Sequence, residues 1–281
     1  MKREQNKNSY QQKQISRRSY QIILFVFLLW GVIFCSSGLA QNKGVSKGRF
    51  EPKWHSVGIQ LGANLGSIKR FNANGEEITN TFISNLNSIT QVKLGYTAGL
   101  SACYKLNNSI EFELGMQFSD RGYQFAKQEI IYGDPIDPSR GGTANYFRGT
   151  YSPTSIQQVA HFYYLEIPFF THFSLGKKKL RMVGSLGISH GYLHTSTNTN
   201  LFEFKDSENI RSTRKNASPY NRFTMNGSVG LGVEYALGST TKIRMQPIFT
   251  YGFLNLIDAP IGAHLWSSGI TVGVYNLFAS K

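Results

Sequence analysis

Beyond about residue 54, apolar and polar residues alternate with a period of two, which is the pattern of β-strands. One stretch shows this clearly, because Ile110, Phe112 and Leu114 alternate with Glu111 and Glu113. No helical periodicity of useful length is visible in the same part of the chain, so we predict an all-β fold. The alternation predicts eight strands, at about 55–65, 95–106, 109–121, 162–175, 179–194, 223–237, 241–253 and 265–278.

The connections between these strands alternate in length. Tight turns are expected near 106–108, 176–178 and 238–240. Long polar links are expected at about 66–94, 122–161 and 195–222. Because antiparallel neighbours are the ones that tight turns can join, the sequence predicts an up-and-down meander with tight turns on one rim and long loops on the other.

Two architectures fit this alternation, and they differ in where the apolar face lies. A soluble sandwich or lipocalin-like barrel buries that face, whereas a membrane barrel turns it towards lipid and encloses the polar face. Here the polar face is rich in Gly and Ser, which suits a narrow lumen, and the strands reach the roughly 9–11 residues of a tilted span. Aromatic residues also lie near strand ends, as they do at membrane interfaces: Tyr163, Tyr192, Tyr251, Phe253 and Trp266. We therefore predict an eight-stranded antiparallel up-and-down transmembrane β-barrel, which has no open edge.

The interior of an eight-stranded barrel is just wide enough to be filled by side chains, so we expect a packed polar plug instead of an open pore. The inward positions carry charges of both signs, and these must pair because an unpaired buried charge is costly. An acid/base pair or a cation site among the carboxylates is the alternative interpretation. The predicted network contains Glu111, Glu113, Arg121, Glu166, His172, Arg181, Glu234, Lys242 and Arg244.

The segment 163–170 (YYLEIPFF) is apolar except for one carboxylate and one proline. If Leu165 and Ile167 face lipid, Glu166 points into the lumen. Pro168 removes one hydrogen-bond donor from the strand ladder, so we expect a local bulge in the barrel wall there.

The first forty residues have the layout of a secretory signal peptide. Residues 1–20 are basic, an apolar run of about 13 residues follows from Ile22 to Phe34, and small residues precede a cleavage site after Ala40. A signal anchor is the weaker interpretation, because a spanning helix needs about 20 apolar residues. We therefore predict a signal peptide at 1–40, a short periplasmic segment at 41–54 and a barrel at 55–281, with both mature termini periplasmic and the long loops extracellular.

Charge and cysteine content narrow the chemistry. The residues 1–40 contribute +5 to the formal net charge of +14, so the mature chain keeps about +9. Export and the lack of a basic helix argue against nucleic acid as a partner, so lipopolysaccharide is the expected anionic partner.

Only Cys103 remains after cleavage, which excludes an intrachain disulfide and a cysteine-based metal site. We expect neither a metal nor a cofactor.

Four short motifs together resemble the PorT-like family of outer-membrane β-barrels. They are Gly95–Leu100 (GYTAGL), Ser109–Gly115 (SIEFELG) ending at Arg121–Gly122, Tyr164–Phe169 (YLEIPF) and Gly230–Glu234 (GLGVE). The resemblance spans about 57–278 and implies a small outer-membrane barrel of a Gram-negative bacterium. Most relatives have no known activity; the namesake takes part in a protein-secretion and gliding apparatus. The chain departs from the usual barrel ending, because Ala-Ser-Lys follows Phe278 and Asn276 stands where an aromatic residue is common.

One cluster suggests an enzymatic alternative. His190, Tyr192 and His194 are predicted on the outward face of their strand, where a lipid-modifying hydrolase places its histidine. Such a site needs a nucleophile and an orienting acid, for which Ser or Thr at 195–197 and the acids at 203–208 are the candidates. The favoured interpretation is that these three residues belong to the interfacial aromatic girdle.

The long loops are the predicted place for specific function. We therefore expect a non-enzymatic structural or interaction protein at the cell surface, in a secretion or surface assembly; the other alternative is a narrow solute channel. Its expected partners are outer-membrane lipid, lipopolysaccharide, the barrel-assembly machinery and an envelope protein. The candidate binding residues in the loops are Tyr146, Phe147, Arg148, Tyr151, Arg211, Arg214 and Lys215.

Overall fold

The computed structural model describes residues 53–72, 77–130, 152–176, 179–205, 207–215, 220–238, 240–257 and 261–277. All of them belong to one compact unit, Glu51–Lys281. The predicted signal peptide lies outside the described residues.

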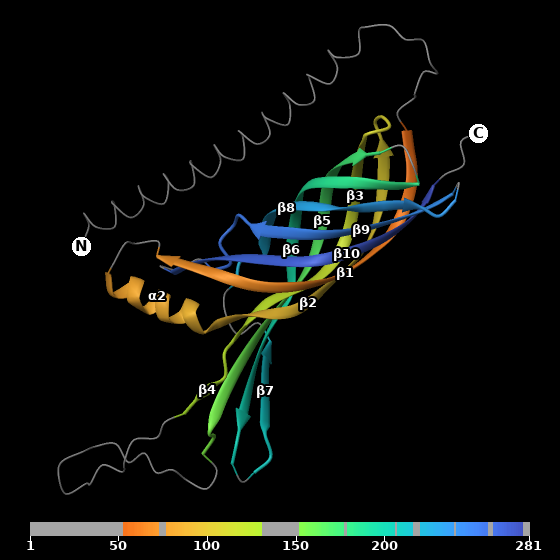
Figure 1. Ribbon diagram of the computed structural model, residues 1–281. Helices are drawn as coiled ribbons and strands as arrows, with labels where there is room; N and C mark the ends of the chain where they lie inside the picture. Colours follow the sequence, from red (N-terminus) through yellow and green to blue (C-terminus); the bar gives the residue numbers. More distant parts are fainter. Residues whose placement is uncertain are drawn as a thin grey trace, which may run out of the picture. The chain divides into compact units, whose positions relative to one another are not determined.

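Eight strands close into a ring (Figure 1), which confirms the predicted all-β up-and-down fold. Every neighbouring pair is antiparallel, and β10 returns to β1 with a register that runs from Ser56 opposite Leu277 to Asn72 opposite Ile261. Consecutive strands therefore pair all round the ring, and no edge is left on it. The strands are β1 (Lys53–Asn72), β2 (Thr90–Lys105), β3 (Ile110–Phe125), β5 (Ser155–Leu175), β6 (Leu180–Glu203), β8 (Phe223–Ala236), β9 (Thr241–Gly252) and β10 (Ile261–Leu277).

The two rims of the ring differ, as the connection lengths predict. The first residues of β1, the last residues of β10 and the three tight turns after β2, β5 and β8 lie at one end, which we call the short-turn end. The opposite rim, the long-loop end, carries the longer connections.

The long-loop end contains a helix that the sequence analysis did not predict. The helix α2 (Glu77–Ile89) lies between β1 and β2, and it buries Ile83 while Phe82 remains exposed. Its apolar positions span only 13 residues among Asn, Thr and Ser, so a helical period was too short to stand out. The prediction of a long polar link without a helix was wrong there.

Part of the predicted long loops is strand. β5 begins seven residues earlier and β6 ends nine residues later than predicted. Two further strands pair with these extensions, β4 (Gln128–Glu129) with β5 and β7 (Ile210–Lys215) with β6. We call β4, β7, residues 155–161 and residues 197–203 the arm; Figure 1 shows it extending away from the ring.

The two faces of the wall follow the inverted pattern. Outward apolar side chains are widely exposed, for example Ile59 at 59% and Leu231 at 72%, whereas the inward charged residues are buried. This is the arrangement of a barrel whose outer surface meets lipid.

The bulge predicted at Pro168 is not there. β5 keeps one register against β3 and against β6 on both sides of Pro168. Gly115 faces the proline ring, and a Cβ at this glycine would lie 3.3 Å from Pro168 Cγ and 2.9 Å from the Leu100 carbonyl oxygen. The register shift lies at Tyr163/Tyr164 instead, where β6 carries the extra residue His194.

Candidate functional site

The lumen at the short-turn end is filled by an ion network. Lys242 Nζ lies 2.7 Å from a Glu111 oxygen and 3.2 Å from Glu234, and Arg244 bridges Glu234 at 2.8 Å and Glu113 at 2.9 Å. Arg244 also pairs with Glu111. These residues come from β3, β8 and β9, and all five side chains are buried. The pairing across the lumen compensates the cost of removing the charges from water.

His172 and Tyr275 complete this network. His172 Nε2 lies 3.0 Å from Glu113 Oε2, and its Nδ1 lies 2.7 Å from Ser185 Oγ. The Tyr275 hydroxyl donates to Glu113 at 2.9 Å, while Arg244 Cζ lies 4.9 Å from the centre of the Tyr275 ring. We call the seven residues Glu111, Glu113, His172, Glu234, Lys242, Arg244 and Tyr275 the ionic plug.

Two glycines make room for the tyrosine of the ionic plug. A Cβ at Gly58 would lie 2.4 Å from the Tyr275 ring, and one at Gly273 would lie 2.6 Å from it. The glycines on the polar face therefore allow a large ring to lie across a narrow lumen.

Arg181 is the one residue of the predicted network that the structure leaves outside the ion pairs. It is half-buried and forms no ion pair with any described residue. It lines a cavity of about 80 Å³ at the short-turn end together with Lys105, Glu111, Glu234 and Lys242. Its position next to this open rim, where water can solvate the guanidinium, removes the need for a partner.

A second charged cluster lies in the middle of the barrel. Arg121 Nη2 lies 2.8 Å from Glu166 Oε2, and the Gln117 amide donates to the same oxygen at 2.6 Å. Asn226 donates to Glu166 Oε1 at 3.4 Å and to Ser189 Oγ at 3.1 Å. Glu166 is fully buried, so the carboxylate in the apolar-looking segment 163–170 is a lumenal group, as the alternation indicated.

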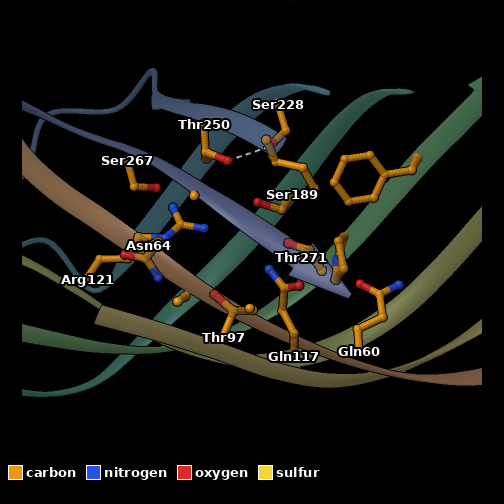
Figure 2. Close-up of a pocket in the computed structure, with 16 residues that line it drawn as sticks. Gln60, Asn64, Thr97, Gln117, Arg121, Ser189, Ser228, Thr250, Ser267 and Thr271 are labelled. Carbon is orange, nitrogen blue, oxygen red and sulfur yellow. Dashed lines mark hydrogen bonds between the residues drawn. The ribbon is translucent and has the colours of Figure 1, made fainter. Parts of the chain in front are cut away.

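A small polar cavity of about 50 Å³ lies beside this pair (Figure 2). Its lining includes Gln60, Asn64, Gln117, Arg121 and Thr271, which Figure 2 shows around one space. A volume of this size holds roughly three to five water molecules.

The lumen at the long-loop end is closed by apolar side chains. The strand alternation predicts a polar plug throughout the lumen. This end differs because inward Phe162, Tyr164 and Tyr123 pack with residues from the connections. The ring of Phe162 meets that of Tyr220 edge-on at 4.8 Å. We call this cluster the apolar plug: Ile68, Tyr123, Ala160, Phe162, Tyr164, Leu193, Leu256, Ala263 and Leu265, with Phe125, Tyr220 and Ile257 packed against it.

A third charged cluster was missed by the sequence analysis. Lys93 Nζ lies 2.8 Å from Asp120, and His161 Nδ1 lies 3.1 Å from the same carboxylate. Asp120 shares its strand parity with Phe118, so simple alternation places it towards lipid, yet it is 4% exposed. A register shift between Val92 and Tyr96 accompanies the cluster on β2, and no sequence period reveals such a shift.

The histidines of the enzymatic alternative do not form a catalytic arrangement. His190, Tyr192 and His194 are exposed on the outward side, as predicted. Within the part of the chain that the structure describes, neither imidazole has a hydrogen-bond partner, whereas a catalytic histidine needs both a nucleophile and an acid. No group of three or more His, Cys, Asp or Glu residues suited to a metal occurs among the described residues.

The predicted loop residues have two outcomes. Tyr146, Phe147, Arg148 and Tyr151 lie outside the described residues. Arg211, Arg214 and Lys215 lie on β7 of the arm, and all three are exposed. They were predicted in a loop because β7 has only six residues and its apolar and polar positions alternate weakly.

Comparison with known proteins decides the class. The sequence model of the outer membrane protein beta-barrel domain matches residues 40–258. The chain belongs to this family. It is therefore an outer-membrane β-barrel protein, and the predicted membrane architecture is confirmed. In the described residues, no helix is long and apolar enough to cross a membrane.

Solved outer-membrane proteins resemble the chain only distantly. Neisserial surface protein A is 12% identical, with 79% of this chain and 97% of that chain covered and a TM-score of 0.37. OprG from Pseudomonas aeruginosa is 12% identical, with coverages of 81% and 98% and a TM-score of 0.36. The outer membrane protease OmpT from Escherichia coli is 10% identical, with coverages of 83% and 99% and a TM-score of 0.39. These similarities are too low to transfer a function, and no curated protein matches the chain.

Proposed function

We propose that this outer-membrane barrel is a non-conducting, non-enzymatic protein that acts as a structural or interaction component of the cell surface. The observation that carries the proposal is the lumen, which is filled at one end by the ionic plug and at the other by the apolar plug. The arm supports an interaction role, because it offers strands that the barrel itself does not need for closure.

The first test addresses the alternative of a narrow channel. Purified protein in planar bilayers is expected to give no single-channel current, since the ionic plug and the apolar plug occupy the two ends of the lumen and the cavity beside Arg121 measures about 50 Å³. Folding of the protein is verified by its heat-dependent migration in electrophoresis, and insertion is verified by its flotation with the lipid vesicles that are fused to the bilayer. Regular conductance steps from inserted wild-type protein would refute the closed-lumen proposal and favour the channel.

The second test addresses the alternative of a lipid-modifying enzyme. The outward histidines His190 and His194 lack partners among the described residues, which supports a girdle role. Mass spectrometry of lipid A from a deletion strain is expected to match the parent strain. A changed lipid A profile that returns on complementation would overturn the non-enzymatic assignment.

We further propose that the long-loop end faces the outside and that both mature termini are periplasmic, with residues 1–40 removed as a signal peptide. Short turns inside and longer loops outside are the usual arrangement of outer-membrane barrels. Ser207→Cys in the connection between β6 and β7 and Asn108→Cys in a tight turn form a matched pair, since both positions are exposed. A membrane-impermeant maleimide added to intact cells is expected to label only Ser207→Cys. The native Cys103 is buried and is expected not to react. Labelling of Asn108→Cys alone would show that the barrel has the opposite orientation.

Among outer-membrane barrels, the motifs at 95–100, 109–122, 164–169 and 230–234 support a relationship to the PorT-like family. This relationship motivates a role in a secretion or surface assembly, with lipopolysaccharide and an envelope protein as partners and the barrel-assembly machinery acting during biogenesis. Cross-linking of native membranes followed by affinity capture tests it. Enrichment of one envelope protein that disappears when residues 207–215 are deleted supports the proposal, whereas recovery of lipid alone contradicts a protein partner.

A further inference from the structure

The strand β7 gives the arm an unpaired edge. All six residues, Ile210–Lys215, are in register with β6, from Thr197 opposite Lys215 to Phe202 opposite Ile210. β7 is the last strand in the sheet order, and none of the described strands pairs with its other side. Five of its six residues are exposed. An edge of this length presents backbone donors and acceptors to which another strand can be added.

The opposite edge of the arm is different. β4 contains only Gln128 and Glu129, so it offers too short a ladder for a further strand. Next to it, Lys127 pairs with Glu203. The β4 edge of the arm is therefore too short to accept a further strand, whereas the β7 edge is longer.

The charge of the β7 edge is uniform. Arg211 and Lys215 lie on one face of the strand with Thr213, and Arg214 lies on the other face. β7 contains no acidic residue, and in the described part of the chain none of its three cations forms an ion pair. Their partners across the ladder are the uncharged Leu201, Thr197 and Asn198.

The geometry points to strand addition: we infer that the free edge of β7 accepts an extended acidic segment of a partner protein as an additional strand. This inference rests on the proposed interaction role of the arm. A second copy of β7 is a poor occupant because it would bring three further cations to this edge, and pairing Arg211 with Lys215 places like charges directly opposite, which is destabilising. Two partner carboxylates four residues apart match Arg211 and Lys215, which are about 13 Å apart along the strand.

The experiment uses the purified full chain in detergent micelles. The probe is a fluorescent peptide of Thr and Val with two glutamates four residues apart, and binding is followed by anisotropy. We expect binding that slows hydrogen exchange of those amides in 210–215 that point away from β6, because main-chain hydrogen bonds form the added ladder. The double variant Arg211→Gln, Lys215→Gln is expected to weaken binding by about tenfold, corresponding to two surface charge contacts. Arg214→Gln, on the other face, is the matched control and is expected to weaken it less.

An N-methylated version of the same peptide separates strand pairing from simple charge attraction. It keeps both carboxylates but loses backbone donors, so we expect it not to bind. Equal binding of the N-methylated peptide overturns the inference, as does absence of binding by the original peptide. Competition by a sulfated oligosaccharide without protection of the 210–215 amides also overturns it and assigns β7 to glycan contact. Micelles have no sidedness, so these outcomes are independent of the conductance and orientation tests of the proposed function.

Discussion

The two ends of the lumen are closed by different kinds of interaction. At the short-turn end, Arg244 is 1% exposed and lies among three carboxylates. At the long-loop end, Phe162 is fully buried among aromatic and aliphatic side chains. The same period-two alternation produces both ends, because an inward position is defined by the wall and not by polarity.

The difference shows that one end is held by charge pairing among the ring strands and the other by apolar packing that includes the connections. The ionic plug is built by residues of the ring strands alone, whereas the apolar plug also needs Leu256 and Tyr220 from outside those strands. A charge network is intolerant of losing one member, since the remaining charges stay buried. An apolar cluster loses contacts in proportion to the volume removed.

The largest expected effect comes from Arg244→Ala. The substitution leaves Glu111, Glu113 and Glu234 with Lys242 as their only remaining permanent cation in the ionic plug, so the free energy of unfolding is expected to fall by about 3–5 kcal/mol. Unfolding in denaturant measures this free energy, with the fraction of folded protein determined from its heat-dependent migration in electrophoresis. A variant as stable as the wild type would show that the ionic plug does not hold this end.

Phe162→Ala tests the apolar plug. The substitution is expected to lower the free energy of unfolding by about 3 kcal/mol. This is at the low end for a buried phenylalanine, because Tyr220 and Phe125 can move into the space that the ring leaves. The same unfolding assay measures the change. If Phe162→Ala lowers the free energy of unfolding more than Arg244→Ala does, the apolar plug contributes more to stability than the ionic plug.

Glu166→Gln tests the pair between the two plugs. The change keeps the size of the side chain but removes the charge that Arg121 contacts at 2.8 Å, so we expect a loss of about 1–3 kcal/mol. The control is the same change in an Arg121→Met background, where the loss should shrink because the partner charge is absent. An unchanged melting temperature for Glu166→Gln alone argues against a structural role of the pair.

The smallest effect is expected outside the lumen, at Glu203 of the arm. Its hydrogen bond with the Lys127 ammonium lowers the pKa of this carboxyl, so any stabilisation is present above the ordinary carboxyl pKa and is lost as the pH falls. Because the pair is solvent-exposed, Glu203→Gln is expected to leave the melting temperature unchanged at neutral pH. A clear decrease that vanishes in acid would show that the arm is stabilised by charge in the same way as the ionic plug.

Much of the barrel could be predicted because its signals are local. Each strand shows its inward and outward faces within its own residues, and this suffices to place Glu111, Glu113, Glu166 and Arg244 on the inner face. The helix α2, the strand β7 and the cluster of Lys93 with Asp120 could not be predicted. Their formation depends on short segments and on a register shift, which leave no periodic signal in the sequence.

The segment YYLEIPFF at 163–170 shows which features can be predicted from one strand and which depend on the folded barrel. The alternation within one strand is enough to point Glu166 inward between lipid-facing Leu165 and Ile167, because successive side chains lie on opposite faces of a strand. Three further facts depend on the folded barrel: Arg121 is the partner of Glu166, Gly115 accommodates Pro168 without a bulge, and Tyr164 belongs to the apolar plug. Which side chains meet across the lumen depends on the relative register of several strands and on ring closure, and no single strand contains that information.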